Sequence, residues 1–485
     1  MDDEAREQEQ EWSFGGMLRQ RKWFFIAIGI MIAVILMPTP SGLSAEGKYM
    51  LALLVVVIIC FFTEAIPLPA VALFIGVYQI VMGITEFKEL PATYMEDAVF
   101  FIMGALMIGA VLVRYGVHNR IALFILKLSG TKVRWVVAGI ITTCALAAGF
   151  ISEHAVATIM LPVGIGIVAL SGGISKVPAL GKLLMLAIAY GCQIGGLASP
   201  SGGARNAIMI GFLSNPEMTG TTESLAPSYG KWMLMAMPFT LIMIPITTFL
   251  LLKFFRPEVT DVKEAVESIK SEMEAKGGVK FSEGLVIGIF LLTLVLWITL
   301  SEKWGLGGIA IMIAVLFMIM GLSDWKFIER RTQWGVVLLY GGAISMGAAL
   351  GKTGAAAWIA DIFLNQLDKV GVTAGLPLVG ATSFLSVVTT NLMADGPAVA
   401  LLGPIHLEMA TLSNTSPLVV GIATSLSSAF AYMLIIGTPA NAIVYGSGFL
   451  KSKDYLKAGW VMAVLSLFMV ILVLAGFWWK LLGIW

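Results

Sequence analysis

Charged residues are scarce in this chain. Only 13% of its 485 residues are Asp, Glu, Lys or Arg, whereas 58% are hydrophobic. Soluble domains carry roughly 25% charged residues, so a soluble or disordered protein is excluded. Lys and Arg number 31 against 30 Asp and Glu, which gives a net charge of +1. Such a balance offers no basic face for nucleic acid, and no nucleic-acid partner is expected.

Cysteine and histidine are also rare, with three residues of each. Cys60, Cys144 and Cys192 lie in apolar runs without Cys-x-x-Cys spacing, so we expect buried thiols and no metal site. The chain shows no nucleophile–base spacing, and its glycine pairs lack the phosphate-binding spacing of ATP-driven proteins. The sequence therefore predicts neither an enzyme nor a bound cofactor.

Long apolar runs dominate the remainder. A membrane-spanning helix needs about 20 apolar residues, and these runs are continuous, unlike the alternating strands of a β-barrel. We predict an all-α polytopic membrane protein with about 11 transmembrane helices and two re-entrant hairpins. The spans are expected at 23–37, 48–66, 68–84, 98–113, 183–198, 233–255, 284–300, 305–321, 334–350, 418–436 and 460–482, and the hairpins at 133–171 and 374–412.

The distribution of basic residues predicts the topology. The start of the chain, Met1–Gln20, is polar and acid-rich, so it is not expected to be a cleavable signal peptide. Arg19, Arg21 and Lys22 precede the first apolar run and place the N-terminus inside. Eleven spans put most basic clusters on that side and the C-terminus outside. The expected location is the cytoplasmic (inner or plasma) membrane.

The two halves of the chain resemble each other. Gly104–Ala105 recurs as Gly342–Ala343 at an offset of about 238 residues, and Asn206–Ile208 recurs as Asn441–Ile443. An odd number of spans between the copies inverts the second one, and inverted repeats with broken helices are typical of secondary transporters. The alternative is that small residues recur because they serve helix packing.

Polar residues interrupt the apolar runs at four places of predicted membrane depth. Unwound backbone is tolerated there only where it is buried in protein or lines a wet cavity. Broken helices offer N–H groups to anions and carbonyls to cations. We therefore expect one site that holds an anion beside cations. The four places are the hairpin tip at 152–154, the second hairpin at 389–397, and the breaks at 195–206 and 437–441.

Two motifs suggest a family. Thr63–Leu68 (Thr-Glu-Ala-Ile-Pro-Leu) and Gly437–Asn441 (Gly-Thr-Pro-Ala-Asn) resemble those of the divalent anion/sodium symporter family. That family includes the dicarboxylate, citrate and sulfate carriers of solute carrier family 13, within a wider ion-transporter superfamily. The resemblance implies a homodimer with an elevator motion, in which a transport domain carries both hairpins and both broken helices along a scaffold domain.

The resemblance and the composition together predict a domain plan. The polar segment between the halves is expected to be an amphipathic cytoplasmic connector. The parts are a cytoplasmic tail at 1–22, scaffold parts at 23–113 and 283–350, transport parts at 114–255 and 351–485, and the connector at 256–282.

The chain departs from the family pattern at both hairpin tips and at the first break. Ser152–His154 (Ser-Glu-His) stands where the family has Ser-Asn-Thr, and Ala394–Gly396 (Ala-Asp-Gly) occupies the second tip. Gly202–Asn206 (Gly-Gly-Ala-Arg-Asn) replaces Gly-Thr-Pro-Pro-Asn. The asparagine of each tip has thus become an acid, and a proline has become Arg205.

These replacements leave alternative roles open. Glu153 and Asp395 could bind Na⁺, carry protons, or pair with Arg205 to hold the fold. Arg205 could present its planar fork to an anion, or form a structural salt bridge with either acid. His154 could be a proton-sensitive ligand, a hydrogen-bond donor or a packing residue.

The predicted function is secondary-active transport of small divalent anions, such as dicarboxylates. Because tip oxygens are lost and burial favours protonated acids, we expect proton coupling or exchange, with a Na⁺-coupled dicarboxylate or sulfate symporter as the alternative. A cation/proton antiporter, an anion channel and a lipid-modifying enzyme are further alternatives. The predicted substrate-binding residues are Ser152, Glu153, His154, Ser201, Gly203, Arg205, Asn206, Asn391, Asp395, Gly396, Thr438, Pro439 and Asn441; Glu153 and Asp395 are also the predicted coupling residues.

Overall fold

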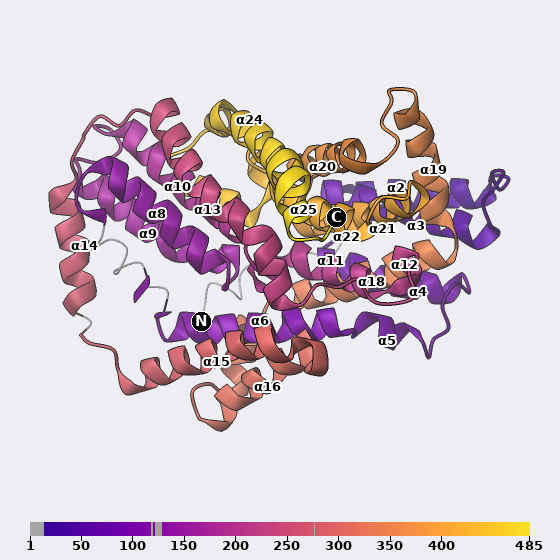
Figure 1. Ribbon diagram of the computed structural model, residues 1–485, viewed down its shortest axis with the longest axis horizontal. Helices are drawn as coiled ribbons and strands as arrows, with labels where there is room; N and C mark the ends of the chain where they lie inside the picture. Colours follow the sequence, from indigo (N-terminus) through magenta and orange to yellow (C-terminus); the bar gives the residue numbers. More distant parts are fainter. Residues whose placement is uncertain (1–13, 118–119, 122–128, 276) are drawn as a thin grey trace.

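The computed structural model describes residues 14–117, 120–121, 129–275 and 277–485 (Figure 1). Nine helices in these ranges are long and apolar enough to cross a membrane, which confirms a multi-pass membrane protein. Most of the tail predicted at 1–22 lies outside the described residues. The candidate spans are α3 (Ala45–Thr63), α6 (Asp97–Arg114), α9 (Glu153–Leu170), α10 (Pro178–Gly195), α13 (Tyr229–Phe254), α15 (Phe281–Trp304), α18 (Trp334–Lys352), α20 (Gly375–Leu392) and the continuous run Ser452–Leu481.

Shorter apolar helices complete the bundle. They are α2 (Lys22–Leu36), α4 (Leu68–Val81), α8 (Val133–Ala148), α16 (Leu306–Ile319) and α22 (Pro417–Ser428). The predicted spans coincide with helices except that the one predicted at 418–436 is helical only to Ser428, because the apolar residues that follow belong to an unwound segment that hydropathy does not reveal. The run Ser452–Leu481 consists of α24 (Ser452–Phe468), a π-helical stretch η4 (Met469–Trp478) and α25 (Trp479–Leu481). The π-helical stretch was not predicted, because hydropathy does not distinguish it from an α-helix.

Both predicted hairpins are pairs of helices, and because α9 and α20 are long enough to cross a membrane, their re-entrant character stays a prediction. The first consists of α8 and α9, and Ser152 caps α9 by accepting a hydrogen bond from the backbone N–H of Ala155. The second consists of α20 and α21 (Asp395–Leu412). Figure 1 shows α8 and α9 on one side of the centre and α21 on the other, with α11 between them. The two tips therefore approach each other from opposite ends.

Both predicted breaks are present, but the second begins earlier than predicted: α22 ends at Ser428 and α23 starts at Pro439, so the predicted 437–441 covers only the end of the break. The first lies between α10 and α11 (Ala204–Ser214) and contains a 3₁₀ turn, η2 (Pro200–Gly202). The second lies between α22 and α23 (Pro439–Tyr445) and contains η3 (Ile435–Gly437). Each break therefore leaves unwound backbone in the middle of the bundle.

One asparagine stabilises each break in the same way. Asn206 donates to the carbonyls of Gly196 and Ser199, both at 2.8 Å. Asn441 donates to the carbonyls of Ala431 and Leu434, at 2.7 and 3.0 Å. In both breaks the acceptors precede the asparagine by ten and seven residues. The repeat seen in the sequence thus extends to the hydrogen bonds of the fold.

Helix packing repeats reciprocally between the halves. A Cβ on Gly104 of α6 would lie 2.5 Å from the Cβ of Ala310 on α16. A Cβ on Gly342 of α18 would lie 2.9 Å from the Cα of Ala72 on α4. Gly104 and Gly342 are separated by the same number of residues as Ala72 and Ala310, so they are equivalent pairs of the repeat. Each half therefore supplies the glycine of one contact and the alanine of the other. This exchange of partners is what an approximate two-fold axis produces.

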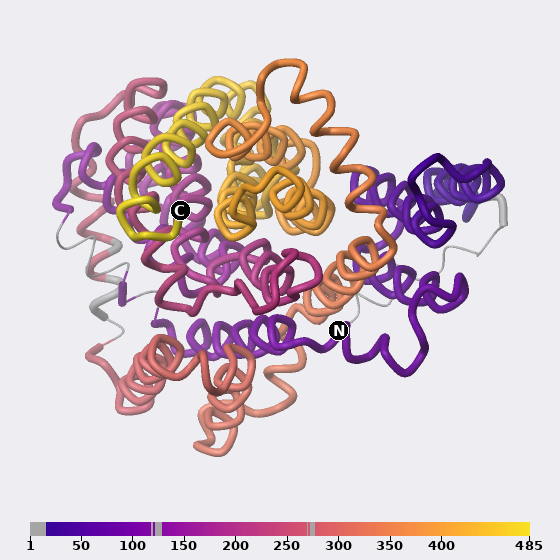
Figure 2. The backbone as a smooth tube through the Cα atoms, turned by 45° about the vertical axis from the view of Figure 1, so that its right-hand side comes forward, coloured from indigo at the N-terminus to yellow at the C-terminus, as the bar shows by residue number. Residues whose placement is uncertain are grey.

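The remaining described helices lie in loops and at the edges. Figures 1 and 2 place α2 and α3 at one end of the molecule and the connector helix α14 at the other. α14 packs on α9 through the buried Ala265 and Val266 and exposes its polar face, as the amphipathic pattern predicted. α19 was not predicted, because it lacks an apolar run of spanning length. These helices are α1 (Phe14–Gln20), α5 (Leu90–Tyr94), α12 (Pro216–Thr219), α14 (Lys263–Ala275), α17 (Trp325–Arg331) and α19 (Ala355–Asp368).

Candidate functional site

A cavity of about 600 Å³ lies between two groups of elements. One wall comes from α6, α17 and α18, and the other from the first hairpin tip and the first break. The second hairpin and α23 each reach this cavity with one residue, Asp395 and Pro439. The predicted site residues that line it are Ser152, Glu153, His154, Ser201, Gly203, Arg205, Asp395 and Pro439.

A buried charge cluster joins the two hairpin tips. Arg205, in the first turn of α11, is fully buried. Its Nη2 donates to Oε1 of Glu153 at 2.5 Å, and its Nη1 donates to Oδ2 of Asp395. The salt bridge considered for Arg205 is therefore present, with both acids at once. Because all three side chains also line the cavity, this triad (Glu153, Arg205 and Asp395) is part of its wall.

Three helix N-termini meet at the triad. α9 begins at Glu153, α11 at Ala204 and α21 at Asp395, and all three residues line the cavity. The N-terminus of a helix behaves like about +0.5 elementary charge, which stabilises an acid in the first turn. Three such ends contribute about +1.5, more than the single net negative charge of an ionised triad. The cavity can therefore bind an anion next to the triad, although the triad contains two carboxylates.

Three predicted asparagines lie outside the cavity wall, and the fold uses their polar atoms. Besides its two donated bonds, Asn206 accepts from Ser425, and Asn441 accepts from Gln193. Asn391 donates to the carbonyls of Val387 and Phe430 and accepts from the N–H of Met433. In this structure these amides hold the breaks in shape.

Two further predicted residues also lie outside the cavity wall. Gly396 donates its backbone N–H to Oδ1 of Asp395 at 2.7 Å. Thr438 caps α23 by accepting from the backbone N–H of Asn441. Both hydrogen bonds orient residues that are close to the cavity, but neither Gly396 nor Thr438 lines it.

Sequence reasoning did not identify the hydrogen-bonded support beneath the first tip. The Ser199 hydroxyl donates to the carbonyl of Gly149 in the tip. It also contacts the hydroxyls of Ser201 and Tyr229 at 3.1 Å, and the Tyr229 ring stacks on Trp297 of α15 with centroids 4.8 Å apart. Ser199 lies within the predicted break. Nothing in the sequence around Tyr229 points to the site, because its role depends on how α13 packs.

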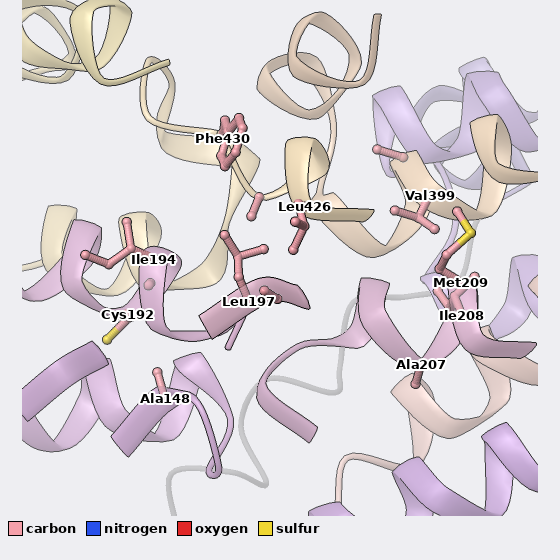
Figure 3. Packing of buried hydrophobic residues seen from close by; sticks show 14 of the residues in the cluster. Ala148, Cys192, Ile194, Leu197, Ala207, Ile208, Met209, Val399, Leu426 and Phe430 are labelled. Atoms are coloured by element: carbon pink, nitrogen blue, oxygen red, sulfur yellow. The ribbon is translucent and has the colours of Figure 1, made fainter. Parts of the chain in front are cut away.

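Apolar packing encloses the site from behind. Figure 3 shows Cys192, Ile194 and Leu197 around the end of α10, with Ala148 close by and Phe430, which belongs to the second break, on the other side. All five side chains are buried. Unwound backbone at this depth is thus enclosed by protein, as such segments require.

The mouth of the cavity is basic. Arg114 and Arg331 line it, and both are exposed. Arg114 lies 3.4 Å from Asp324 and 4.5 Å from the ring centroid of Phe327. The hydrogen bond from the backbone N–H of Phe327, together with Arg114, lowers the pKa of Asp324 below its ordinary value. Both arginines belong to basic clusters that the charge distribution predicts to lie inside, so an opening of the cavity toward that side stays a prediction.

Comparison with known proteins supplies the family. Residues 19–485 match the model of the family described as "Sodium:sulfate symporter transmembrane region". The chain is also 26% identical over 471 residues to a protein of Staphylococcus saprophyticus named "Sodium-dependent dicarboxylate transporter SdcS". That alignment covers 92% of this chain and 88% of the relative.

Two solved structures share the fold at low sequence identity. MtrF of Neisseria gonorrhoeae is 13% identical with a TM-score of 0.59, and the match covers 94% of each chain. The YdaH transporter of Alcanivorax borkumensis is 12% identical with a TM-score of 0.57, covering 82% of this chain and 88% of that one. At this identity the likeness concerns the fold alone, and that fold occurs in membrane transporters.

Proposed function

Because the chain belongs to the sodium:sulfate symporter family, we propose that it is a secondary-active, Na⁺-coupled carrier of small dicarboxylates. The family match confirms the resemblance first seen in Thr63–Leu68 and Gly437–Asn441. The chain is a multi-pass membrane transport protein and not an enzyme. The dicarboxylate and the coupling ion are the parts that need an experiment.

The observation that carries the proposal is the convergence of both hairpin tips and the first break on one cavity. Three helix N-termini point their partial positive charge at the same place, beside Arg205. A small anion with two carboxylates can use backbone N–H groups at several of these ends. The hydroxyls of Ser152 and Ser201 and the imidazole of His154, which also line the cavity, can orient it.

Charge balance supports coupling to a cation. An ionised triad carries a net charge of −1, and a dicarboxylate adds two further negative charges. Moving these charges together through the membrane interior is costly unless cations accompany them. The residues alone favoured protons or exchange, whereas the name of the Staphylococcus relative favours sodium. We therefore assign the role of accompanying cation to Na⁺. In the prediction from the sequence, Na⁺ coupling is the alternative to proton coupling or exchange.

The cation ligands in this proposal are the tip carboxylates. Oε2 of Glu153 has no hydrogen-bond partner among the described residues, whereas Oε1 is held by Arg205. Among the described residues, Oδ1 of Asp395 accepts a hydrogen bond from the N–H of Gly396 and from no other group. Carboxylate oxygens suit hard cations, so both side chains can contribute to Na⁺ binding. Proton binding at the same oxygens is the competing possibility.

The proposal keeps the elevator arrangement and the homodimer as predictions. The cavity lies between the predicted scaffold, represented by α6 and α18, and the predicted transport domain, represented by α9 and α11. A disulfide between Ala105→Cys on α6 and Thr158→Cys on α9, both cavity-lining positions, is expected to stop transport until it is reduced. Transport that continues under full cross-linking would contradict the motion. A monomeric mass in lipid nanodiscs would contradict the dimer.

Uptake by proteoliposomes tests the function directly. Purified protein is reconstituted, and entry of labelled succinate is followed with a Na⁺ gradient, with choline replacing Na⁺, and with a pH gradient in choline. The proposal predicts saturable uptake that requires Na⁺. Uptake driven by the pH gradient in choline would favour protons, and uptake of sulfate but not succinate would overturn the substrate assignment.

A further inference from the structure

We propose that the guanidinium of Arg205 is a fixed coupling cation that takes the place of one mobile Na⁺ at the junction of the two hairpin tips. The inference rests on the proposed function, because it concerns how many Na⁺ ions accompany each dicarboxylate. It identifies Arg205 as a residue that sets the coupling ratio.

The geometry of the triad carries the first step. Glu153 and Asp395 are the opening residues of α9 and α21, at equivalent positions in the two hairpins. Two carboxylates brought together in a buried site repel each other unless a cation lies between them. Here the guanidinium lies between them, with one Nη on each acid. Its planar fork lets one cation hold two tips.

Burial argues for a role beyond stability. Arg205 is fully buried, and Glu153 and Asp395 are 4% and 8% exposed. A buried ion pair contributes little net stability, because desolvation offsets its attraction. If Arg205 served only to stabilise the fold, one carboxylate would be enough to pair with it. Nε of Arg205 moreover has no acceptor among the described residues, so the protein does not saturate this guanidinium.

Asymmetry between the halves supplies the second step. The two asparagines of the breaks are equivalent, and the residue before each is Arg205 in the first half and Ala440 in the second. The acids are duplicated, but the cation is not. One guanidinium balances one of the two carboxylates, and Oε2 of Glu153 stays open for a mobile ion. The structure thus holds one cation in place and leaves a ligand for another.

A fixed cation changes the charge moved per cycle. Arg205 travels with the protein in both directions, so its charge cancels over a complete cycle, whereas the charge of a released Na⁺ does not. Removing the guanidinium opens the space between the two carboxylates to Na⁺. The variant should then carry one more Na⁺ with each dicarboxylate than the natural protein does.

The reversal potential of succinate flux in proteoliposomes measures this ratio. Arg205→Ala is expected to raise the number of Na⁺ per succinate by one and to need more Na⁺ for half-maximal uptake. Arg205→Lys keeps the charge and is expected to keep the natural ratio. Arg256→Ala, which removes an exposed arginine outside the cavity, is the matched control and should also keep it. A merely structural Arg205 would leave the ratio unchanged in every variant.

Guanidinium chloride provides the second measurement. If Arg205→Ala is inactive or unstable, free guanidinium in the buffer is expected to restore uptake and raise the melting temperature, with no such effect on the natural protein. An active Arg205→Ala variant with an unchanged ratio contradicts the proposal. A loss of function or fold that neither Na⁺ nor guanidinium restores also contradicts it. If the natural protein transports succinate equally well in choline, the proposed Na⁺ coupling fails, and the guanidinium rescue still reports on Arg205.

Discussion

The two halves of the site have the same frame and different chemistry. Asn206 and Asn441 close their breaks with hydrogen bonds of identical spacing. Next to them, the first half carries Arg205 and the second carries Ala440. The frame is duplicated because both breaks must satisfy unwound backbone inside a membrane. The cation is single because one guanidinium can serve both tips.

This comparison separates residues that shape the site from residues that line it. The predicted asparagines belong to the frame, whereas Glu153, His154 and Arg205 line the cavity. Changes in the frame should therefore affect stability equally in both halves. Changes in the lining should affect transport and differ between the halves.

The largest stability effect is expected at the two asparagines of the breaks. Asn206→Ala or Asn441→Ala leaves two carbonyls of a break without their donor, and each unsatisfied buried group costs about 1–3 kcal/mol. We predict a loss of about 2–5 kcal/mol for either variant, measured by unfolding in detergent. Asn365→Ala on the exposed surface of α19 is the control and should change stability by less than about 0.5 kcal/mol. A neutral effect in only one break would disprove their equivalence.

The next effect concerns the reciprocal glycines. Gly104→Ala and Gly342→Ala force a Cβ into Ala310 and Ala72, and overpacking of this kind costs about 1–3 kcal/mol. Gly308→Ala on α16 meets no atom within 4 Å and should gain up to about 1 kcal/mol from helix propensity. Melting temperatures of the three variants measure the difference. Equal behaviour of all three would show that the close approach is absent.

The sequence predicted the frame better than the lining. Hydropathy located the helices and hairpins, because a spanning run of apolar residues has few alternatives in a membrane. Polar residues at membrane depth located the tips and breaks. Composition could not show that Asn391 and Asn441 turn away from the cavity, because side-chain direction depends on tertiary packing. The contribution of Tyr229 had no local signal for the same reason.

A smaller effect, the pH dependence of stability, is expected to come from Glu96 in the first half and to have no equivalent in the second. Burial raises the pKa of Glu96, just before α6, to about 7, whereas the equivalent residue of the second half is Trp334, the first residue of α18. Because the folded pKa lies above the unfolded one, ionisation disfavours the fold, and stability falls as pH rises from about 4.5 through 7. Glutamine cannot ionise, so at pH 8 the Glu96→Gln variant should be more stable than the natural protein. After allowance for the partial exposure of Glu96, we expect a gain of about 1–2 kcal/mol. Unfolding at pH 5 and pH 8 tests this, and a variant that gains no stability at pH 8 contradicts it.

The smallest effect is expected at the connector. Arg120 holds Glu283 at 2.6 and 2.9 Å and also donates to the carbonyls of Gly277 and Gly278. The equivalent residue of the second half, Trp358, instead donates to the carbonyl of Ser41. The side chains of Arg120 and Glu283 are 26% and 9% exposed. Removing Arg120 lets water reach the Glu283 carboxylate, so Arg120→Ala should lower stability by about 1 kcal/mol, and by less in high salt. A larger loss, independent of salt, would make this contact part of the frame.

Protection of an introduced thiol tests the central claim, that a dicarboxylate and Na⁺ bind together in the cavity at the triad. Thr158 lines this cavity and is exposed, whereas all three native cysteines are buried. The rate at which a maleimide labels Thr158→Cys is measured with succinate in Na⁺, with succinate in choline, and with Na⁺ alone. The account predicts that labelling slows severalfold only when succinate and Na⁺ are both present. Labelling that is unchanged by succinate in Na⁺, or slowed equally in choline, would contradict it.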